Sequence, residues 1–200
     1  MPGRIVILNG APRAGKSSIA AVIQRSFDGL WVNLGVDVYM AATRQLSPSI
    51  GLRPGGERPD LEPKLPLLYA GLYESIAAHS RLGLDVVADL GHHESYSRPL
   101  GILPDCARRL SGLPVLFVGV RCPIEVIMAR RNADSQGSFY ETGETPPPTV
   151  AIWQTAVHMP GIYDLELDTS VLSREACAAR IETALANPPA PSAFERLARL

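Results

Sequence analysis

The sequence predicts an α/β fold, a three-layer sandwich with helices on both faces of a central parallel sheet of about five strands. Segments with the spacing of strands alternate along the chain with segments that have the 3.6-residue period of helices. One strand segment, residues 114–120, is a continuous apolar run, which is typical of a parallel strand covered on both faces. The 200 residues suit one domain. We expect this domain at residues 1–187, followed by a proline-rich linker and a short helix at 188–200.

The first predicted strand, residues 5–8, leads into a glycine-containing loop and then into a helix with one apolar face. A second short strand at residues 31–34 precedes Gly35-Val36-Asp37 and a helical stretch that continues through Leu46. Residues 47–66 are rich in proline and glycine, so we expect a surface excursion there rather than a packed element.

The remaining elements follow the same alternation. A helix at residues 66–82 ends before Gly83, a suitable C-cap, and a third strand at 84–88 closes with Asp89. Further along we predict a helix at 104–110, a strand at 114–120, a helix opened by Pro123, a helix at 150–158, a strand at 164–168 and a helix at 175–186. The polar stretch at 132–148 is a second excursion, and residues 130–148 are the predicted lid. Residues 192–200 suggest a docked terminal helix, with a dimer contact as the alternative.

Composition excludes several classes of protein. Apolar residues make up 46% and charged residues 20%, which excludes disordered, collagenous and coiled-coil chains. Nineteen basic and twenty acidic residues give a net charge of −1, which argues against a nucleic-acid partner. The three cysteines contain no CxxC pair, so neither a disulfide framework nor a zinc site is indicated. No apolar run approaches a signal-peptide core or a membrane span, so we expect a cytoplasmic protein with no membrane partner.

Residues 10–17, Gly-Ala-Pro-Arg-Ala-Gly-Lys-Ser, match the P-loop (Walker A) pattern GxxxxGK[ST] at every fixed position, between a predicted strand and a predicted helix. Such a loop holds polyphosphate with consecutive backbone N–H groups and with the positive end of the following helix. We expect Lys16 to reach the β and γ phosphates of ATP and the Ser17 hydroxyl to ligate Mg²⁺. The predicted nucleotide-binding residues are Gly10, Ala11, Pro12, Arg13, Ala14, Gly15, Lys16, Ser17 and Ser18.

Two carboxylates follow other predicted strands, where acceptors bind in open α/β sheets. Asp37, at a strand-to-helix turn, is the candidate catalytic and substrate-binding residue that orients an acceptor hydroxyl and accepts its proton. Its alternative role, compatible with the first, is the N-cap of a helix beginning near Val38. Asp89 is a candidate ligand of Mg²⁺ or of the acceptor, and a capped turn is the alternative.

Three further side chains are candidates on weaker grounds. Arg130 precedes the second excursion, and an arginine on a closing segment would stabilise the charge that develops during transfer, so it is a candidate catalytic residue. A solvated helix end is the alternative for Arg130 and for Arg131. His92 is a candidate substrate-binding residue near Asp89. With His93 it forms an adjacent pair whose side chains should point in different directions, and no third residue has metal-ligand spacing.

Other stretches accompany the P-loop in a fixed order. They are residues 7–10, 14–17, 35–37 (Gly-Val-Asp), 118–122 (Val-Gly-Val-Arg-Cys), 157–158 and 163–169 (Tyr-Asp-Leu-Glu-Leu-Asp-Thr). Together they resemble the chloramphenicol phosphotransferase family over residues 4 to about 170. The resemblance implies a cytoplasmic P-loop kinase that moves the γ-phosphoryl group of ATP, with Mg²⁺, to a hydroxyl of a small antibiotic. It also implies a shikimate-kinase-like sheet with the P-loop strand at its centre, and Asp37 corresponds to the family's proposed base.

The chain departs from the family pattern at places that bear on the acceptor. Residues 90–95 (Leu-Gly-His-His-Glu-Ser) are polar where the family is apolar and glycine-rich, and Arg130 is followed by adjacent Arg131 rather than by spaced arginines. The first excursion also contains Arg53, Arg58 and Glu62. A more polar antibiotic, bearing a sugar or an amine, is therefore an alternative to a chloramphenicol-like acceptor.

We accordingly expect an ATP-dependent O-phosphotransferase that modifies a small hydroxylated antibiotic and so confers resistance or self-protection. A kinase of primary metabolism, acting on a sugar acid or a nucleoside, would share every residue on the phosphate side. A non-catalytic nucleotide-dependent switch would bind ATP without acceptor-stimulated release of ADP. Both a monomer and a homo-oligomer are compatible with the sequence.

Overall fold

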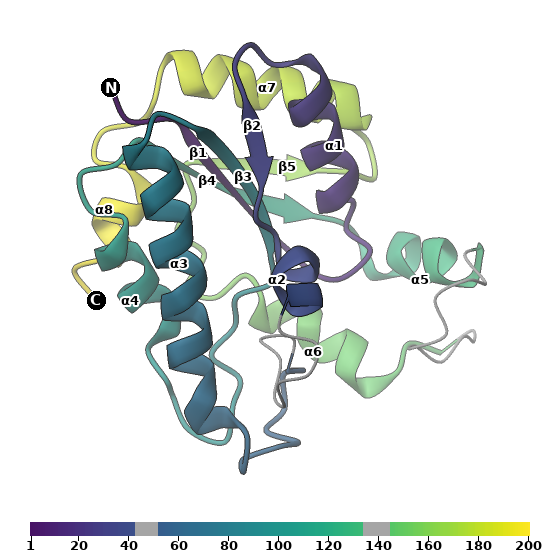
Figure 1. Ribbon diagram of the computed structural model, residues 1–200. Helices are drawn as coiled ribbons and strands as arrows, with labels where there is room; N and C mark the ends of the chain where they lie inside the picture. The colour runs from purple at the N-terminus through teal and green to yellow at the C-terminus, as the bar shows by residue number, and fades with distance from the viewer. Residues whose placement is uncertain (43–51, 134–144) are drawn as a thin grey trace.

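Five parallel strands form one sheet with helices on both faces (Figure 1). The computed structural model describes residues 1–42, 52–133 and 145–200. The strands are β1 (Ile5–Asn9), β2 (Trp31–Asn33), β3 (Asp85–Leu90), β4 (Val115–Arg121) and β5 (Leu165–Asp168). Their order is β2-β3-β1-β4-β5, so the strand before the P-loop is central. The predicted α/β class with a five-stranded parallel sheet is confirmed.

The helices form three groups around the sheet (Figure 1). One face is covered by α1 (Lys16–Ser26) and α7 (Arg174–Ala186). The other face is covered by α3 (Leu65–Arg81), α4 (Ile102–Arg109) and α8 (Ala193–Leu197). Near the carboxyl ends of the strands lie α2 (Val36–Ala42), α5 (Ile124–Ala133) and α6 (Pro148–Ala156).

The side chains of β1 alternate between two apolar clusters. Val6 and Leu8 join the cluster under α1 and α7, and Ile5 and Ile7 join the cluster under α3, α4 and α8. Successive side chains of a strand point to opposite faces, so a central strand must be apolar at every position to bury both faces. All four side chains are fully buried, which explains the unbroken apolar run in the sequence.

Several predicted boundaries differ from those of the structure. β3 continues to Leu90, because Leu8 pairs with Asp89 and Asn9 with Leu90, so Asp89 lies inside a strand rather than in a turn after it. Residues 47–66 are expected to form a surface excursion, but their C-terminal end packs against the rest of the domain. Residues 47–51 lie outside the described residues. A short 3₁₀ turn, η1 (Glu62–Lys64), leads into α3. Glu62 is buried because its carboxylate accepts the Ser97 N–H at 3.0 and 3.1 Å.

Several other predictions fall partly outside the described residues. Of the predicted lid at 130–148, residues 134–144 are not described, and neither are residues 43–46 of the helix predicted to reach Leu46. The described part shows α5 ending at Ala133 and α6 beginning at Pro148. The start of α6 lies two residues before the predicted one, since a proline fits the first turn of a helix.

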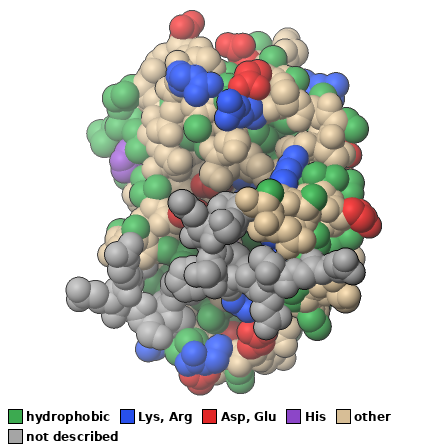
Figure 2. All heavy atoms as spheres, turned by 90° about the vertical axis from the view of Figure 1, so that its right-hand side faces the viewer, with side chains coloured by type: hydrophobic (Ala, Val, Ile, Leu, Met, Phe, Trp, Pro, Cys, Tyr) green, Lys and Arg blue, Asp and Glu red, His purple; other side chains and the backbone are tan. Residues whose placement is uncertain are grey.

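Charges of both signs are mixed on the described surface. Figure 2 shows acidic and basic side chains interspersed over one face, in keeping with a net charge of −1. Among residues 1–42, 52–133 and 145–200, no helix combines the length and the apolar character needed to cross a bilayer.

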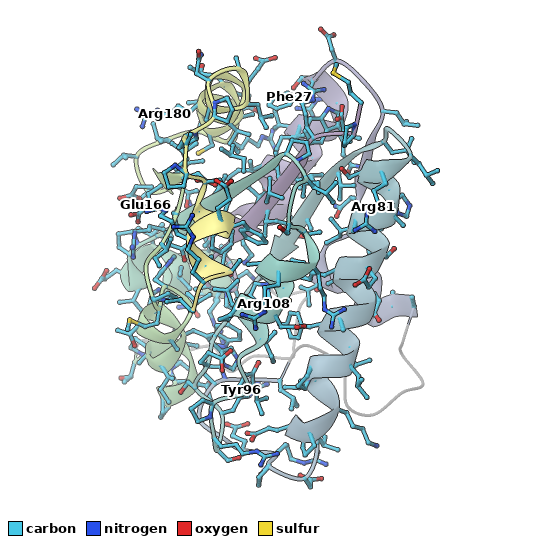
Figure 3. The ribbon with its side chains drawn as sticks, turned by 90° about the vertical axis from the view of Figure 1, so that its left-hand side faces the viewer. Phe27, Arg81, Tyr96, Arg108, Glu166 and Arg180 are labelled. Atoms are coloured by element: carbon cyan, nitrogen blue, oxygen red, sulfur yellow. The ribbon has the colours of Figure 1, made fainter. Side chains whose placement is uncertain are left out.

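The terminal helix α8 completes the core beneath one face of the sheet. Ser192 caps it, and Glu195 closes a capping box with Ser192. The Phe194 ring lies 5.1 Å from Phe117 and 6.4 Å from Tyr73, measured between centroids. α8 lies beside α4 in Figure 3 and contacts it. The tail is therefore part of the domain's packing.

Shortening the tail's main apolar side chain should destabilise the whole domain. Phe194 is 3% exposed, and removing a buried phenyl group leaves a cavity, so Phe194→Ala should lower the free energy of unfolding by about 3–5 kcal/mol. Urea unfolding followed by circular dichroism measures this. Leu200→Ala, in the same tail with 69% of the side chain exposed, is the control and should change little. Equal effects of the two substitutions would contradict the docked arrangement.

Candidate active site

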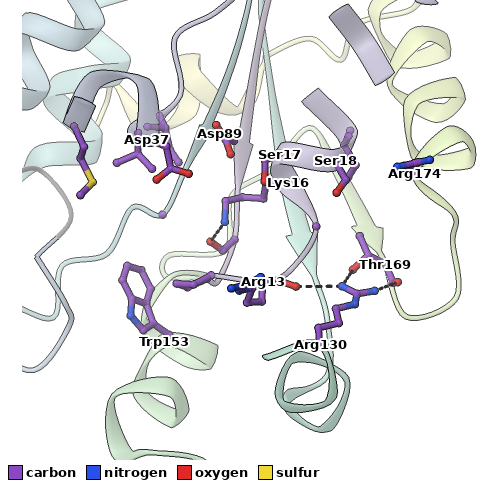
Figure 4. Close-up of a pocket in the computed structure, with 18 of the residues that line it drawn as sticks. Arg13, Lys16, Ser17, Ser18, Asp37, Asp89, Arg130, Trp153, Thr169 and Arg174 are labelled. Atoms are coloured by element: carbon purple, nitrogen blue, oxygen red, sulfur yellow. Dashed lines mark hydrogen bonds between the residues drawn. The ribbon is translucent and has the colours of Figure 1, made fainter. Parts of the chain in front are cut away.

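A cavity of about 950 Å³ opens at the carboxyl ends of the strands. Residues of the P-loop, α2, α6, the end of β3 and the start of α7 line it (Figure 4). Ligands bind at this edge in open α/β sheets, where neighbouring strands lead to helices on opposite faces. β1 meets both neighbours here, because it pairs with β3 on one side and with β4 on the other.

Residues 10–15 of the P-loop connect β1 to α1 in a conformation that needs the two fixed glycines of the motif. A Cβ on Gly10 would overlap the Val120 carbonyl oxygen of β4, and Gly15 has a φ of 94° in the left-handed region. Of the nine predicted nucleotide-binding residues, Ala11 and Ala14 are buried and do not line the cavity. The others do line it: Gly10, Pro12, Arg13, Gly15, Lys16, Ser17 and Ser18.

Lys16 is folded back over the loop. Its Nζ donates to the Gly10 carbonyl at 2.8 Å and to the Ala11 carbonyl at 2.9 Å. Burial lowers the pKa of Lys16 to about 8, and the Asp89 and Asp37 carboxylates act in the opposite direction. An anion arriving at the loop would therefore gain the attraction of an ammonium group that is poorly solvated.

Asp89 points from β3 toward the P-loop and fills space beside Gly35. It is 6% exposed, and a Cβ on Gly35 would overlap its Oδ1 atom. Burial raises the pKa of the carboxyl group, which nearby Lys16 opposes and nearby Asp37 reinforces. Among the described residues no side chain donates a hydrogen bond to this carboxylate. The Asp89 carboxylate and the Ser17 hydroxyl both line this cavity, and Mg²⁺ prefers oxygen ligands of these kinds. These residues therefore fit the expected metal.

Asp37 lies across the cavity from the P-loop (Figure 4). It is the second residue of α2, which begins at Val36 with the Tyr39 N–H bonded to the Gly35 carbonyl. The helix thus begins before the predicted position near Val38, and Asp37 is not an N-cap. Its carboxylate is exposed to the cavity, which leaves it accessible to a bound hydroxyl.

Arg130 reaches from α5 to the other end of the cavity (Figure 4). Its guanidinium donates to the Thr169 carbonyl at 2.7 Å and to the Arg13 carbonyl at 3.2 Å. The Thr169 hydroxyl in turn donates to the Ala14 carbonyl at 2.7 Å. Arg130 therefore ties the P-loop to the segment after β5. Arg131 is 5% exposed, so it is not the solvated helix end considered as its alternative.

His92 does not line the cavity. It is 2% exposed, its Nε2 is hydrogen bonded to the Tyr73 hydroxyl at 2.7 Å, and its ring centroid lies 4.9 Å from that of Tyr69. Burial lowers the pKa of this imidazole to about 3. The structure thus brings Lys16, Asp37 and Asp89 together and places His92 in the core beside them.

Some lining residues escape a reading of the sequence. Trp153 of α6 lines the end that holds Asp37, and Arg174 of α7 lines the end that holds Arg130. Tyr69 of α3 also lines the cavity. They come from helices far apart in the chain and belong to no motif, so only the tertiary fold reveals them. Thr169 does have a signal, because it ends the family-like run at 163–169.

Comparison with known families gives a match over nearly the whole chain. The model of the family described as "Chloramphenicol phosphotransferase-like protein" matches residues 3–186. The chain belongs to this family. The predicted resemblance is confirmed, and the chain is a phosphotransferase with an alcohol group as acceptor.

Relatives of this chloramphenicol phosphotransferase-like chain point the same way. The protein named "Putative O-phosphotransferase Rv2636" from Mycobacterium tuberculosis H37Rv is 29% identical over 210 residues, which cover 98% of this chain and 88% of the relative. Among solved structures, the Mycobacterium tuberculosis APS kinase CysC in complex with AMPPNP and APS is 16% identical, with a TM-score of 0.62 and coverage of 93% of this chain and 99% of the kinase. Shikimate kinase from Aquifex aeolicus is 15% identical, with a TM-score of 0.55 and coverage of 91% and 96%. These likenesses confirm the shikimate-kinase-like fold.

Adding one methyl group at Gly35 should disturb the Asp89 carboxylate. The new Cβ would overlap the Oδ1 atom of Asp89. Gly35→Ala should therefore lower the affinity for Mg²⁺ in the presence of ADP by about 10–100-fold, the usual cost of disturbing groups around a bound metal. Titration of Mg²⁺ against a fluorescent ADP analogue measures this. Asp89→Asn should have a similar effect, and the double variant should be no weaker than the single ones. Val38→Ala, at an exposed position on the same helix, is the control. An unchanged affinity for Mg²⁺ in Gly35→Ala would contradict the expected role of Asp89 in holding the metal.

The pKa of Lys16 predicts a pH dependence of nucleotide binding. Polyphosphate binds best to the charged ammonium, and with a pKa of about 8 the charged fraction in the free protein falls as the pH rises above 8. ADP affinity should thus fall between pH 8 and 9.5, by at most about tenfold per pH unit. Arginine remains charged, so Lys16→Arg should show no such fall. Calorimetric titrations test this, and equal slopes for the two proteins would refute it.

Proposed function

We propose that the protein is a cytoplasmic, ATP- and Mg²⁺-dependent kinase that phosphorylates a hydroxyl of a small antibiotic and thereby confers resistance or self-protection. The observation that carries the proposal is the placement of Asp37 and Lys16 on one cavity, on opposite sides of the space where an acceptor would bind. Its volume of about 950 Å³ is at the upper end of ordinary ligand pockets. Such a volume suits a nucleotide and a small acceptor together.

On the phosphate side, the loop's backbone and Lys16 would hold the β and γ phosphates. Lys16 would exchange its bonds to the Gly10 and Ala11 carbonyls for bonds to phosphate oxygens. Ser17 and Asp89 would hold Mg²⁺, which when bound neutralises charge on the phosphates. Arg130 would keep the loop in place through its hydrogen bonds to the Arg13 and Thr169 carbonyls. Its positive charge would stabilise the negative charge on the phosphoryl group during transfer.

On the acceptor side, Asp37 would orient the hydroxyl toward the γ-phosphorus and accept its proton as the new P–O bond forms. The bond between the γ-phosphorus and the β,γ-bridging oxygen would break in the same transfer, and ADP would leave with that oxygen. Val36, Met40 and Trp153 line the same end and offer apolar surface to the body of the acceptor. This surface favours a chloramphenicol-like molecule over a wholly polar one.

A kinase for a sugar acid is the second candidate. Arg53 lines the same cavity as Asp37, and a guanidinium is well suited to bind a carboxylate. A non-catalytic switch has less support, because it has no use for a carboxylate exposed to the acceptor end of the cavity.

A panel of alcohols separates these functions. ADP release from ATP would be measured by a coupled assay with chloramphenicol, streptomycin, gluconate and adenosine as acceptors. We expect stimulation by one of the two antibiotics. Stimulation by gluconate or adenosine alone would support primary metabolism, and ADP binding with no stimulation by any acceptor would support a switch.

Asp37→Asn should slow catalysis far more than it weakens nucleotide binding. The amide can still occupy the position but cannot accept the proton, so kcat should fall by about 10²–10⁴-fold while the affinity for ATP stays within about twofold. Asp60→Asn, at an exposed position outside the cavity lining, is the control. Wild-type turnover in Asp37→Asn would leave Asp37 with a merely structural role.

A further inference from the structure

His93 is a buried histidine at the edge of the cavity with no part in the proposed chemistry. It is 4% exposed and does not belong to the cavity lining. Its ring centroid lies 4.3 Å from that of Tyr96 and 5.0 Å from that of Trp153, and the Trp153 contact is edge-to-face with an interplanar angle of 88°. Aromatic pairs in this arrangement attract one another beyond the effect of burial alone. His93 is thus fixed between two aromatic side chains.

The polar contact of His93 defines its protonation. Nε2 lies 3.1 Å from the Leu52 carbonyl oxygen, and a carbonyl can only accept, so Nε2 carries the proton. Nδ1 is buried without a hydrogen-bond partner among the described residues. A proton on Nδ1 would therefore have no acceptor, and burial accordingly lowers the pKa of His93. The side chain is a neutral imidazole, and its one N–H group donates to the Leu52 carbonyl.

Two of these three contacts of His93, those with Trp153 and Leu52, lead directly to the acceptor end of the cavity. Trp153 lines the cavity, and its ring packs against the backbone at Gly91, where a Cβ would lie 3.1 Å from Cζ3. Leu52 precedes Arg53, which also lines the cavity. Trp153 and Arg53 come from segments a hundred residues apart in the sequence, and His93 contacts the first and holds the neighbour of the second.

The end of the cavity that holds Arg130 is separate from these contacts. Arg130 and Thr169 lie on the far side of the P-loop from Trp153 (Figure 4). No hydrogen bond or ring contact within the described residues joins His93 to either of them. A change at His93 should therefore reach the acceptor end and leave the end that holds Arg130 unaffected.

We propose that His93 is a positioning residue that sets the acceptor end of the cavity, its ring holding Trp153 against Gly91 and its Nε2–H holding the chain at Leu52 beside Arg53. The inference rests on the proposed function in one respect, namely that an acceptor alcohol binds at this end of the cavity. The physical part, the fixing of Trp153, holds independently of which alcohol is phosphorylated. It gives a role to one member of the adjacent histidine pair, whereas His92 packs against Tyr69 and Tyr73.

Three substitutions separate the ring contact from the hydrogen bond. His93→Phe keeps a ring beside Trp153 and loses the donor, His93→Gln keeps an N–H donor and loses the ring, and His93→Ala loses both. The chain has two tryptophans, so a Trp31→Phe background leaves Trp153 as the sole indole fluorophore. In that background His93→Ala should shift Trp153 emission to the red and increase its quenching by acrylamide. His93→Phe should stay close to the parent, and His93→Gln should lie between them.

Kinetics then test the link to the acceptor. The probe is whichever of chloramphenicol, streptomycin, gluconate and adenosine gives the highest turnover with the wild-type enzyme. His93→Ala should raise KM for this alcohol by about tenfold, equivalent to about 1.4 kcal/mol, with KM for ATP within about twofold. His93→Phe and His93→Gln should each restore part of the loss. His79→Ala, on the half-buried face of α3 away from the cavity lining, is the matched control and should change neither constant.

The outcomes decide between positioning and general structure. Unchanged Trp153 emission and quenching in His93→Ala would overturn the proposal, and so would equal increases in KM for ATP and for the alcohol. If His93→Ala fails to fold, His93→Phe and His93→Gln still give the two readouts. If no alcohol in the panel stimulates ADP release by the wild-type protein, the proposed function fails. In that case the emission and quenching of Trp153 still test whether His93 positions Trp153. A red shift in His93→Ala with unchanged ADP affinity would support the positioning role, and unchanged emission and quenching would overturn it.

Discussion

The side-chain amide of Asn9 holds together the three segments that form the site. It donates to the Val157 carbonyl at 2.8 Å and to the Tyr163 hydroxyl at 3.0 Å, and it accepts the His92 N–H at 2.7 Å. Asn9 is 1% exposed and directly precedes the P-loop, so these bonds form in a medium where an unsatisfied amide would be costly. The end of β1, the loop after β3 and the turn after α6 are thereby fixed relative to one another.

Two carboxylates close to Lys16 have opposite environments, and this difference supports the roles proposed for them. Asp89 is buried beside Gly35, where a carboxylate is stable only with a cation nearby. Asp37 lies on the first turn of a short helix and is exposed to the cavity, where it can exchange partners during a reaction. A fixed charge suits the holding of a cation, and an accessible one suits the transfer of a proton.

The sequence predicts those parts of the site whose signal is local. The P-loop glycines and Lys16 are adjacent in the chain, and Asp37 and Asp89 follow from the rule that parallel strands end at one edge. His92 and His93 show where this reasoning stops. Both follow β3, and without the packing of Tyr69 and Trp153 nothing tells which ring enters the core and which borders the cavity. Glu62 is similar, because its burial depends on the backbone of Ser97, thirty-five residues away.

The position of α8 has a consequence for synthesis of the chain. Phe194 fills the space between Phe117 and Tyr73, so the apolar cluster on that face of the sheet stays open until α8 has left the ribosome. Until then the nascent chain presents apolar side chains of β4 and α3 to its surroundings, the type of exposure that favours aggregation or chaperone binding. Native structure on that face therefore requires that this five-residue helix has been synthesised and has packed in place.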